Sequence, residues 1–148
     1  MSRSRMGMAL FCLTGLFVSL YLYLYKIGAI GALACGTGGC ETVQLSPQSR
    51  LLGVIEVSLI GVIGYGVMLL LALLALQPRF AGRSWPATLL VLLSSGAVLF
   101  SAYLTYLELF VIHAICRWCV GSAVIITLIW IVSLLSLRSP EPRTDPAA

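Results

Sequence analysis

The sequence predicts an all-α integral membrane protein, in which four transmembrane helices form a bundle with an outward loop or half-helix between the first two. The first observation behind this fold class is composition. Of the 148 residues, 60% are hydrophobic and only 9% are charged, whereas a soluble domain is about half apolar and a quarter charged. A chain this small cannot hide so much apolar surface in its own interior. The second observation is that four apolar runs are long enough to cross a bilayer.

The four runs cover about residues 6–25, 51–76, 85–111 and 117–137. Each reaches or nearly reaches the roughly 20 residues that a helix needs to span the hydrocarbon layer. The first run follows SRSR, as in a signal peptide, but it is longer than the usual apolar core of about 7–15 residues. GALAC resembles a lipoprotein cleavage site only with Ala32 and Leu33 in reversed order. We therefore expect one membrane domain over 1–137 and a polar cytoplasmic tail over 138–148.

Small residues within the runs predict close contacts between helices. Gly15 and Ser19 form a row at four-residue spacing in the first run, and the second run carries glycines at 61, 64 and 66. The lone cysteine of the first run, Cys12, is expected to pack as a small apolar side chain.

Basic residues predict the orientation of the bundle, because they favour the cytoplasmic side. With four crossings, one side receives Arg3, Arg5, Arg79, Arg83, Arg138 and Arg143, and the other receives Lys26, Arg50 and Arg117. Both termini are then cytoplasmic in a multi-pass protein of the cell (cytoplasmic or inner) membrane. The segments 27–49 and 112–119 face outward.

The two outward segments contain four cysteines, Cys35, Cys40, Cys116 and Cys119. Disulfides form and persist on the oxidising, extracytoplasmic side of a membrane. The glycines between Cys35 and Cys40 allow that pair to close on itself and also to reach another partner. Further along, Ser46 and Pro47 match the cap and the first residue of a helix.

The second pair lies in CRWCV, at the start of the last run. A helix N-terminus presents free amide N–H groups and a partial positive charge, which stabilise a thiolate. Arg117 adds a full positive charge beside the pair. Thiols in such surroundings have a lowered pKa and react in disulfide exchange.

Three interpretations of the cysteines stay open from the residues themselves. A c-type haem is excluded because Val120, not histidine, follows the second cysteine. A zinc site could use the four cysteines, with His113 as a substitute ligand. Two static disulfides, or redox exchange between the pairs, are the other possibilities. Redox exchange needs a terminal acceptor, and a mobile quinone enclosed by four helices fits a chain that lacks nucleotide-binding motifs.

Two acidic residues and the single histidine lie near the outward ends of the runs. Glu108 and Glu56 are expected close enough to the interface for their carboxylates to reach water. Glu56 is expected to pair with Arg50 or Lys26. His113, three residues before Cys116, fits an ordinary interfacial histidine or a residue that assists proton transfer.

The motifs together resemble the vitamin K epoxide reductase (VKOR) family, most closely its bacterial members. The resemblance rests on CGTGGCETVQLS, then GVIGYG in the second run, then CRWCV at the last run. It implies a four-helix membrane bundle that holds a quinone near its outer face. It also implies that Cys35 exchanges with a reduced thioredoxin-like partner, Cys40 with Cys116, and that Cys119 faces the quinone. Ser46 matches the loop serine of the family near its redox site.

The chain departs from the family pattern at three places. Vertebrate members carry a tyrosine at the position of Ala123, which favours plain quinone reduction here over reduction of vitamin K epoxide. Many bacterial members have a proline where Glu56 stands. Many also continue into a fused thioredoxin-like domain, whereas RSPEPRTDPAA is a polar tail, so we expect a separate thiol protein. The DsbB family, another group of quinone-linked thiol oxidases, carries its two cysteine pairs in the opposite order.

We therefore predict a membrane thiol oxidase that acts as a quinone reductase. It would pass electrons from a thioredoxin-like or DsbA-like thiol protein through Cys35–Cys40 and Cys116–Cys119 to ubiquinone or menaquinone. This activity would support disulfide formation in exported proteins. We expect no metal and no nucleic-acid partner. The alternative is a non-catalytic membrane protein with structural disulfides or a four-cysteine zinc site.

Overall fold

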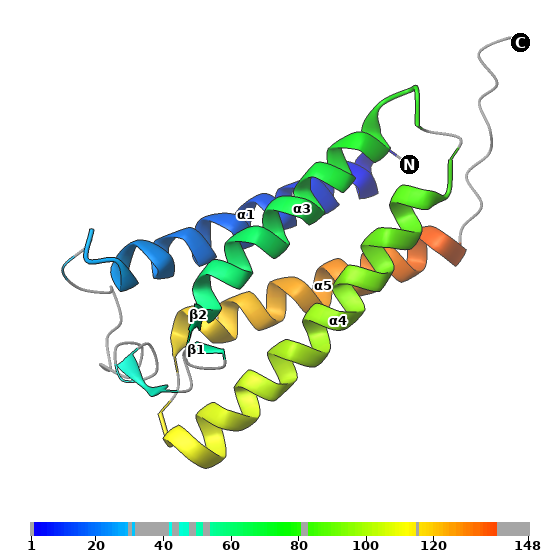
Figure 1. Ribbon diagram of the computed structural model, residues 1–148. Helices are drawn as coiled ribbons and strands as arrows, with labels where there is room; N and C mark the ends of the chain where they lie inside the picture. The colour runs from blue at the N-terminus through cyan, green and yellow to red at the C-terminus, as the bar shows by residue number, and fades with distance from the viewer. Residues whose placement is uncertain are drawn as a thin grey trace, which may run out of the picture.

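The computed structural model (Figure 1) is built from long helices and one short strand pairing. It describes residues 2–29, 31, 42, 45–47, 50–51, 54–80, 83–114 and 116–138. The helices that it describes are α1 (Ser2–Lys26), α3 (Val57–Leu76), α4 (Trp85–Leu107) and α5 (Arg117–Arg138). The π-helix η2 (Glu108–Ile112) continues α4, and the strands are β1 (Arg50–Leu51) and β2 (Ile55–Glu56).

The helices form a closed ring of neighbours. Helix α1 packs against α3 and α5, and α4 packs against the same two helices from the other side. The start of α1, the end of α3, the start of α4 and the end of α5 lie together at one end of the bundle (Figure 1). The strands, η2 and the start of α5 lie at the opposite end, which we call the dithiol end because α5 begins there with the C-x-x-C cysteines.

Four helices in the described residues are long and apolar enough to cross a membrane. Large apolar side chains such as Phe17, Leu70 and Leu99 point away from the bundle and are exposed, as expected for a surface that faces lipid. The buried core is drawn from all four helices and includes Met8, Cys12, Tyr65, Met68, Leu90, Ile126 and Ile129. The predicted all-α membrane bundle is therefore confirmed.

Small residues bring α1 and α3 together, as their spacing predicts. A Cβ added at Gly15 would overlap the ring of Tyr65, and one added at Gly61 would stand 2.7 Å from Ser19 Oγ. Cys12 is fully buried in the core, in agreement with the packing role expected for it.

The second helix begins later than its apolar run. The run starts near residue 51, but α3 starts at Val57 because Arg50–Leu51 and Ile55–Glu56 pair as antiparallel strands. Most of the segment expected to hold a half-helix between the first two spans, and the tail after Arg138, lie outside the described residues.

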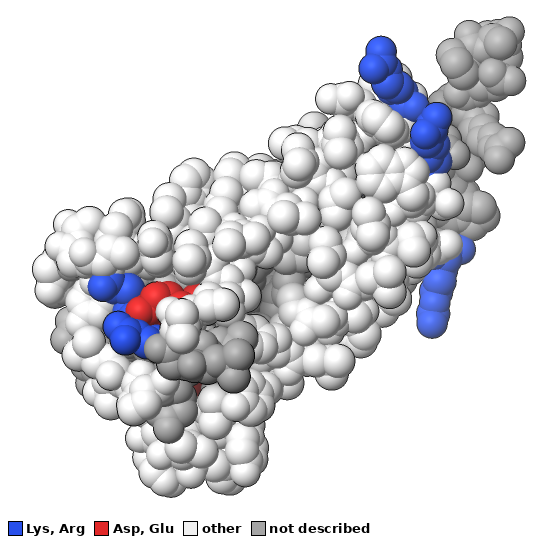
Figure 2. Space-filling view, viewed as in Figure 1, with Lys and Arg blue, Asp and Glu red and all other residues white. Residues whose placement is uncertain are grey.

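The charged side chains of the described residues lie near the two ends of the bundle. On the face shown in Figure 2, Lys and Arg occur at both ends with an uncharged surface between them. At the end opposite the dithiol, Arg5 Nη1 donates to the carbonyl of Ala75 over 2.9 Å. That bond satisfies a carbonyl in the last turn of α3, which has no partner inside its own helix.

Candidate active site

The C-x-x-C cysteines lie where α5 begins. Cys116 directly precedes the helix, and Cys119 lies in its first turn. The backbone N–H of Cys119 donates to Cys116 Sγ over 3.4 Å, and the N–H of Val120 donates to the carbonyl of Cys116 over 3.0 Å. Cys116 therefore caps α5, because its sulfur accepts from an amide that has no partner within the helix. Both thiols are free in the structure.

The pKa of the Cys116 thiol is lowered to about 7. The largest cause is a hydrogen bond from the Cys119 thiol; the backbone N–H groups of Cys119 and Trp118 add to it, while burial and the charge of Glu108 oppose it. Arg117, which the sequence suggested as a source of positive charge, is exposed, and the lowering comes from hydrogen bonds instead. A thiol with this pKa is about half ionised at neutral pH and is a good nucleophile and leaving group in disulfide exchange.

The two sulfurs have different surroundings. Cys116 is fully buried, and Leu22 of α1 and the ring of Trp118 pack around it. That ring in turn packs on Tyr21, with 5.0 Å between the ring centroids. Cys119 is only partly buried and lines a cavity between the helices.

Glu108 brings a carboxylate to both cysteines. Glu108 is 5% exposed, its Oε2 accepts the backbone N–H of Cys116 over 3.2 Å, and it lines the same cavity as Cys119. The expectation that Glu108 reaches water at the interface is therefore wrong. Burial of a carboxylate costs free energy, and the hydrogen bond from Cys116 offsets part of that cost.

The backbone between α4 and α5 explains why Glu108 points inward. Glu108 begins the π-helix η2, and His113, which ends it, is exposed and adopts the left-handed conformation with φ 55°. The N–H of Ala114 then donates to the carbonyl of Glu108 over 3.1 Å. This tight reversal returns the chain across Glu108, so that Cys116 arrives beside the carboxylate. π-Helical turns often occur at functional sites.

The cavity has a volume of about 140 Å³, a size that suits one six-membered ring. Its wall is mostly apolar, with residues such as Leu22, Met68 and Phe100. Its polar groups come from every helix and from the segment before α3, and they include Ser19, Ser46, Ser58, Tyr65, Glu108 and Cys119.

The hydroxyls of Tyr65 and Ser58 differ in their hydrogen-bond partners. The hydroxyl of Tyr65 is bound to Ser122 of α5, 2.9 Å from its Oγ and 3.0 Å from its carbonyl oxygen. Ser58 is 8% exposed, and its Oγ has no hydrogen-bond partner among the described residues. A buried hydroxyl of this kind is costly unless something else, such as a ligand, binds it.

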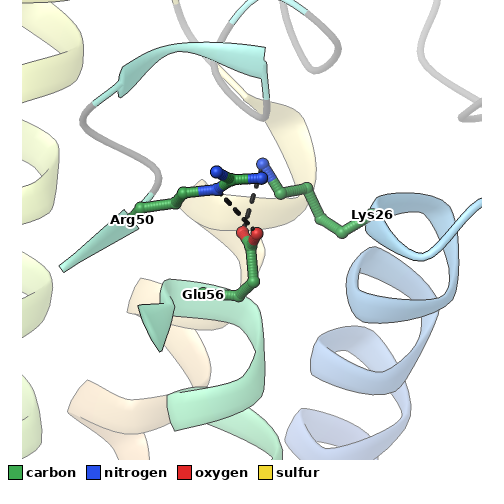
Figure 3. Close-up of polar contacts among 3 residues, drawn as sticks. All are labelled: Lys26, Arg50 and Glu56. Atoms are coloured by element: carbon green, nitrogen blue, oxygen red, sulfur yellow. Dashed lines mark hydrogen bonds and ion pairs between the residues drawn. The ribbon is translucent and has the colours of Figure 1, made fainter. Parts of the chain in front are cut away.

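A separate group of charges lies at the same end of the bundle (Figure 3). Glu56 lies between two cations: its Oε2 is 3.2 Å from Lys26 Nζ, and its Oε1 is 2.9 Å from Arg50 Nε. The expected pairing of Glu56 is therefore confirmed with both partners. Glu56 does not line the cavity, so the two acidic residues of this end have different surroundings.

A comparison with known families matches most of the chain. The family model of the vitamin K epoxide reductase family matches residues 6–134. This match runs from the first turns of α1 into the last turns of α5 and includes Glu108 and both cysteines of CRWC.

The chain belongs to the vitamin K epoxide reductase family.

As a member of this family, the protein is a multi-pass membrane thiol–disulfide oxidoreductase. The family is generally linked to quinones and to thiol–disulfide partners. Cys116 and Cys119 lie together at the start of α5, and Cys119 lines the cavity.

The site residues expected from the sequence fall into two groups. Cys116, Cys119 and Ser46 lie at one end of the bundle, and Ser46 and Cys119 line the same cavity. Cys35 and Cys40 lie outside the described residues. Among the residues that are described, no three His, Cys, Asp or Glu side chains are grouped as metal ligands.

Sequence reasoning missed the position of Glu108, Ser58 and Tyr65 on the cavity wall. For Glu108 a signal existed, since an ionisable residue within an apolar run is a candidate for function. Ser58 and Tyr65 gave no comparable signal, because one hydroxyl in an apolar helix is common and often only packs.

Proposed function

We propose that this protein is a thiol oxidase that reduces a membrane quinone. Electrons would enter from a reduced thioredoxin-like or DsbA-like protein, pass from Cys35–Cys40 to Cys116–Cys119, and leave to ubiquinone or menaquinone. The observation that carries the proposal is the position of Cys119: it lines a mostly apolar cavity while it also donates to the thiolate-forming Cys116.

The cavity residues fit a quinone. A quinone is a flat ring with two carbonyl oxygens, so its site needs apolar walls and a few hydrogen-bond donors. The volume of about 140 Å³ suits the ring, and the unpartnered hydroxyl of Ser58 is a donor for a carbonyl oxygen. Ser46, on the same wall, is a second candidate contact. When bound, the quinone supplies a two-electron acceptor.

The exchange reactions balance as follows. Oxidation of Cys116 and Cys119 forms one S–S bond and yields two electrons and two protons, which convert quinone to quinol. A thiolate of Cys40 then attacks Cys116, and Cys35 attacks Cys40, which restores the Cys116–Cys119 dithiol and forms the Cys35–Cys40 disulfide. The partner's dithiol reduces that disulfide in the same way. The net reaction is partner dithiol plus quinone to partner disulfide plus quinol.

The lowered pKa of Cys116 supports its role as the cysteine that exchanges with the first pair. A thiol with a pKa of about 7 leaves readily from a mixed disulfide. We also propose that the dithiol end faces outward from the cell membrane, with both termini cytoplasmic. The arginines at the opposite end of the bundle, such as Arg5 and Arg138, support this orientation.

The test is oxidation of a reduced thioredoxin-like protein by the purified protein in lipid vesicles that contain ubiquinone or menaquinone. Quinol formation and the partner's disulfide are measured together. We expect Cys119→Ser and Cys116→Ser to abolish quinol formation in folded protein, and Cys12→Ala to keep it because Cys12 only packs. Undiminished quinol formation in Cys116→Ser would refute the relay. Loss of the fold in Cys119→Ser, or loss of the fold on chelation, would favour structural disulfides or zinc.

A further inference from the structure

Glu108 is a buried carboxylate beside the reacting sulfurs, and the proposed relay does not use it. Its side chain is 5% exposed, in a helix that spans the membrane. Among the described residues, no cation forms an ion pair with it, whereas Glu56 at the same end is paired twice. Ionisable residues inside membrane spans are costly and are usually kept for function.

The contacts of Glu108 all lead to the dithiol and the cavity. Its Oε2 accepts the N–H of Cys116 over 3.2 Å, and its side chain lines the same cavity as Cys119. The Glu108 carboxyl and the Cys119 thiol therefore face one space, which is the space proposed for the quinone. The other titratable groups near Glu108 in the described chain are the Cys116 thiol of the same pair and Tyr65 on the cavity wall.

We propose that Glu108 is a catalytic acid–base residue that takes the proton of the Cys119 thiol and delivers it to an oxygen of the quinone. This inference rests on the proposed quinone reduction and adds a residue to it. General acid–base catalysis requires a group within hydrogen-bond reach of the proton that it moves. Glu108 is hydrogen-bonded to the backbone of Cys116 and shares the cavity wall with Cys119, so its carboxyl lies between the dithiol and the space proposed for the quinone.

The step balances with Cys116 as thiolate and Cys119 as thiol. The S–S bond forms between Cys116 and Cys119, and two electrons pass to the quinone. The S–H bond of Cys119 breaks, and its proton moves to the Glu108 carboxylate and then to one quinone oxygen. The second quinone oxygen takes a proton from water, which replaces the proton that Cys116 released when it ionised. Glu108 ends the cycle as a carboxylate, as it began.

The decisive variant is Glu108→Gln, which keeps an acceptor oxygen for the Cys116 N–H but cannot carry a proton. In vesicles with quinone and a reduced thioredoxin-like protein, we expect its kcat for quinol formation to fall by about a hundredfold or more. Exchange between the partner and the Cys35–Cys40 pair, measured in one turnover without quinone, should keep the wild-type rate, because that step does not involve Cys116. Glu56→Gln is the matched control, since Glu56 is an acid of the same end that does not line the cavity; it should keep the wild-type kcat.

Chemical rescue separates proton transfer from a merely structural role. Glu108→Ala removes the carboxyl and leaves space, so added formate should restore part of its quinol formation but should not help Cys119→Ser. If the wild type forms quinol and Glu108→Gln forms it equally fast, the role of Glu108 is refuted while the proposed function stands. Failure of formate to raise the rate of folded Glu108→Ala would also refute it. If the wild type forms no quinol, both proposals fall.

Discussion

Lys26 Nζ lies 3.2 Å from Glu56 Oε2, so the last residue of α1 is ion-paired with the residue that directly precedes α3. Only 8% of the Lys26 side chain and 21% of the Glu56 side chain are exposed. Arg50 binds the other carboxylate oxygen from β1, with 56% of its side chain exposed. Glu56 therefore joins the ends of two membrane helices and the strand pairing between them.

The two cations should contribute unequally to stability. In Lys26→Gln, the covered oxygen of Glu56 loses its charged partner, so we expect a loss of about 1–3 kcal/mol in the free energy of unfolding. Arg50→Gln is the control at the same carboxylate, and it should lose less than about 1 kcal/mol because water screens an exposed pair. Unfolding in detergent micelles measures both. Equal losses of stability in the two variants would show that burial of the Lys26–Glu56 ion pair adds nothing to the free energy of unfolding.

A methyl group at Gly15 should disturb the cavity as well as the core. Its Cβ would stand 2.5 Å from ring atoms Cδ1 and Cζ of Tyr65, so the ring must move and its bond to Ser122 must lengthen. We expect Gly15→Ala to lose about 1–3 kcal/mol of stability and to weaken quinone binding. Gly7→Ala, on the same helix with nothing within 4 Å of the added carbon, should show neither effect. A Gly15→Ala variant with wild-type stability would contradict the close contact of α1 and α3.

The ionisation of Cys116 should depend on its neighbour. With a pKa of about 7, the ionised fraction of the Cys116 thiol should increase as the pH rises through neutrality. Cys119→Ala removes the thiol that donates to Cys116 and should shift the midpoint upward, while Cys119→Ser keeps an O–H donor and should shift it less. Thiolate absorbance in the ultraviolet, with Cys116→Ser subtracted, follows the titration. Identical midpoints in both variants would show that the thiol of Cys119 is not the cause.

A polar contact between α4 and α5 offers a third test of the packing. The indole Nε1–H of Trp130 donates to Ser95 Oγ over 2.9 Å. Because lipid offers no substitute acceptor, Ser95→Ala should lose about 0.6 kcal/mol, the average for such bonds between membrane helices, and no more than about 1.7 kcal/mol. Thr127→Ala is the control, since its hydroxyl binds only Ala123 of its own helix. Combining Ser95→Ala with Trp130→Phe should show coupling of the two residues.

Hydropathy and the spacing of small residues predicted the bundle because they report on single helices. Lipid requires long apolar runs, and a close contact requires residues such as Gly15 and Gly61. The start of α3 at Val57 was not predictable in this way, because the ion pairs of Glu56 and the strand pairing override an apolar run that continues to residue 51. Contacts between segments are not encoded in the hydropathy of either one.

In the candidate site, too, features set by one segment were predictable and features set by contacts between segments were not. CRWC at a helix start predicted a reactive dithiol, since both the motif and the helix end are local. The burial of Glu108 depends on the π-turn and on the left-handed His113, which reverse the chain over the carboxylate. A regular α-helix through residue 112 would carry Cys116 to a different place relative to Glu108, and no pattern in ELFVIHA distinguishes the two conformations.

The complete burial of Cys116 has a consequence for selectivity. Dissolved thiols, peroxides and metal ions cannot touch a sulfur that is covered by Leu22 and Trp118, although its ionised form would react with all of them. Only a cysteine delivered by the protein's own chain, or one admitted by displacement of these side chains, can reach it. The bundle therefore surrounds a reactive thiolate with side chains that protect it from side reactions.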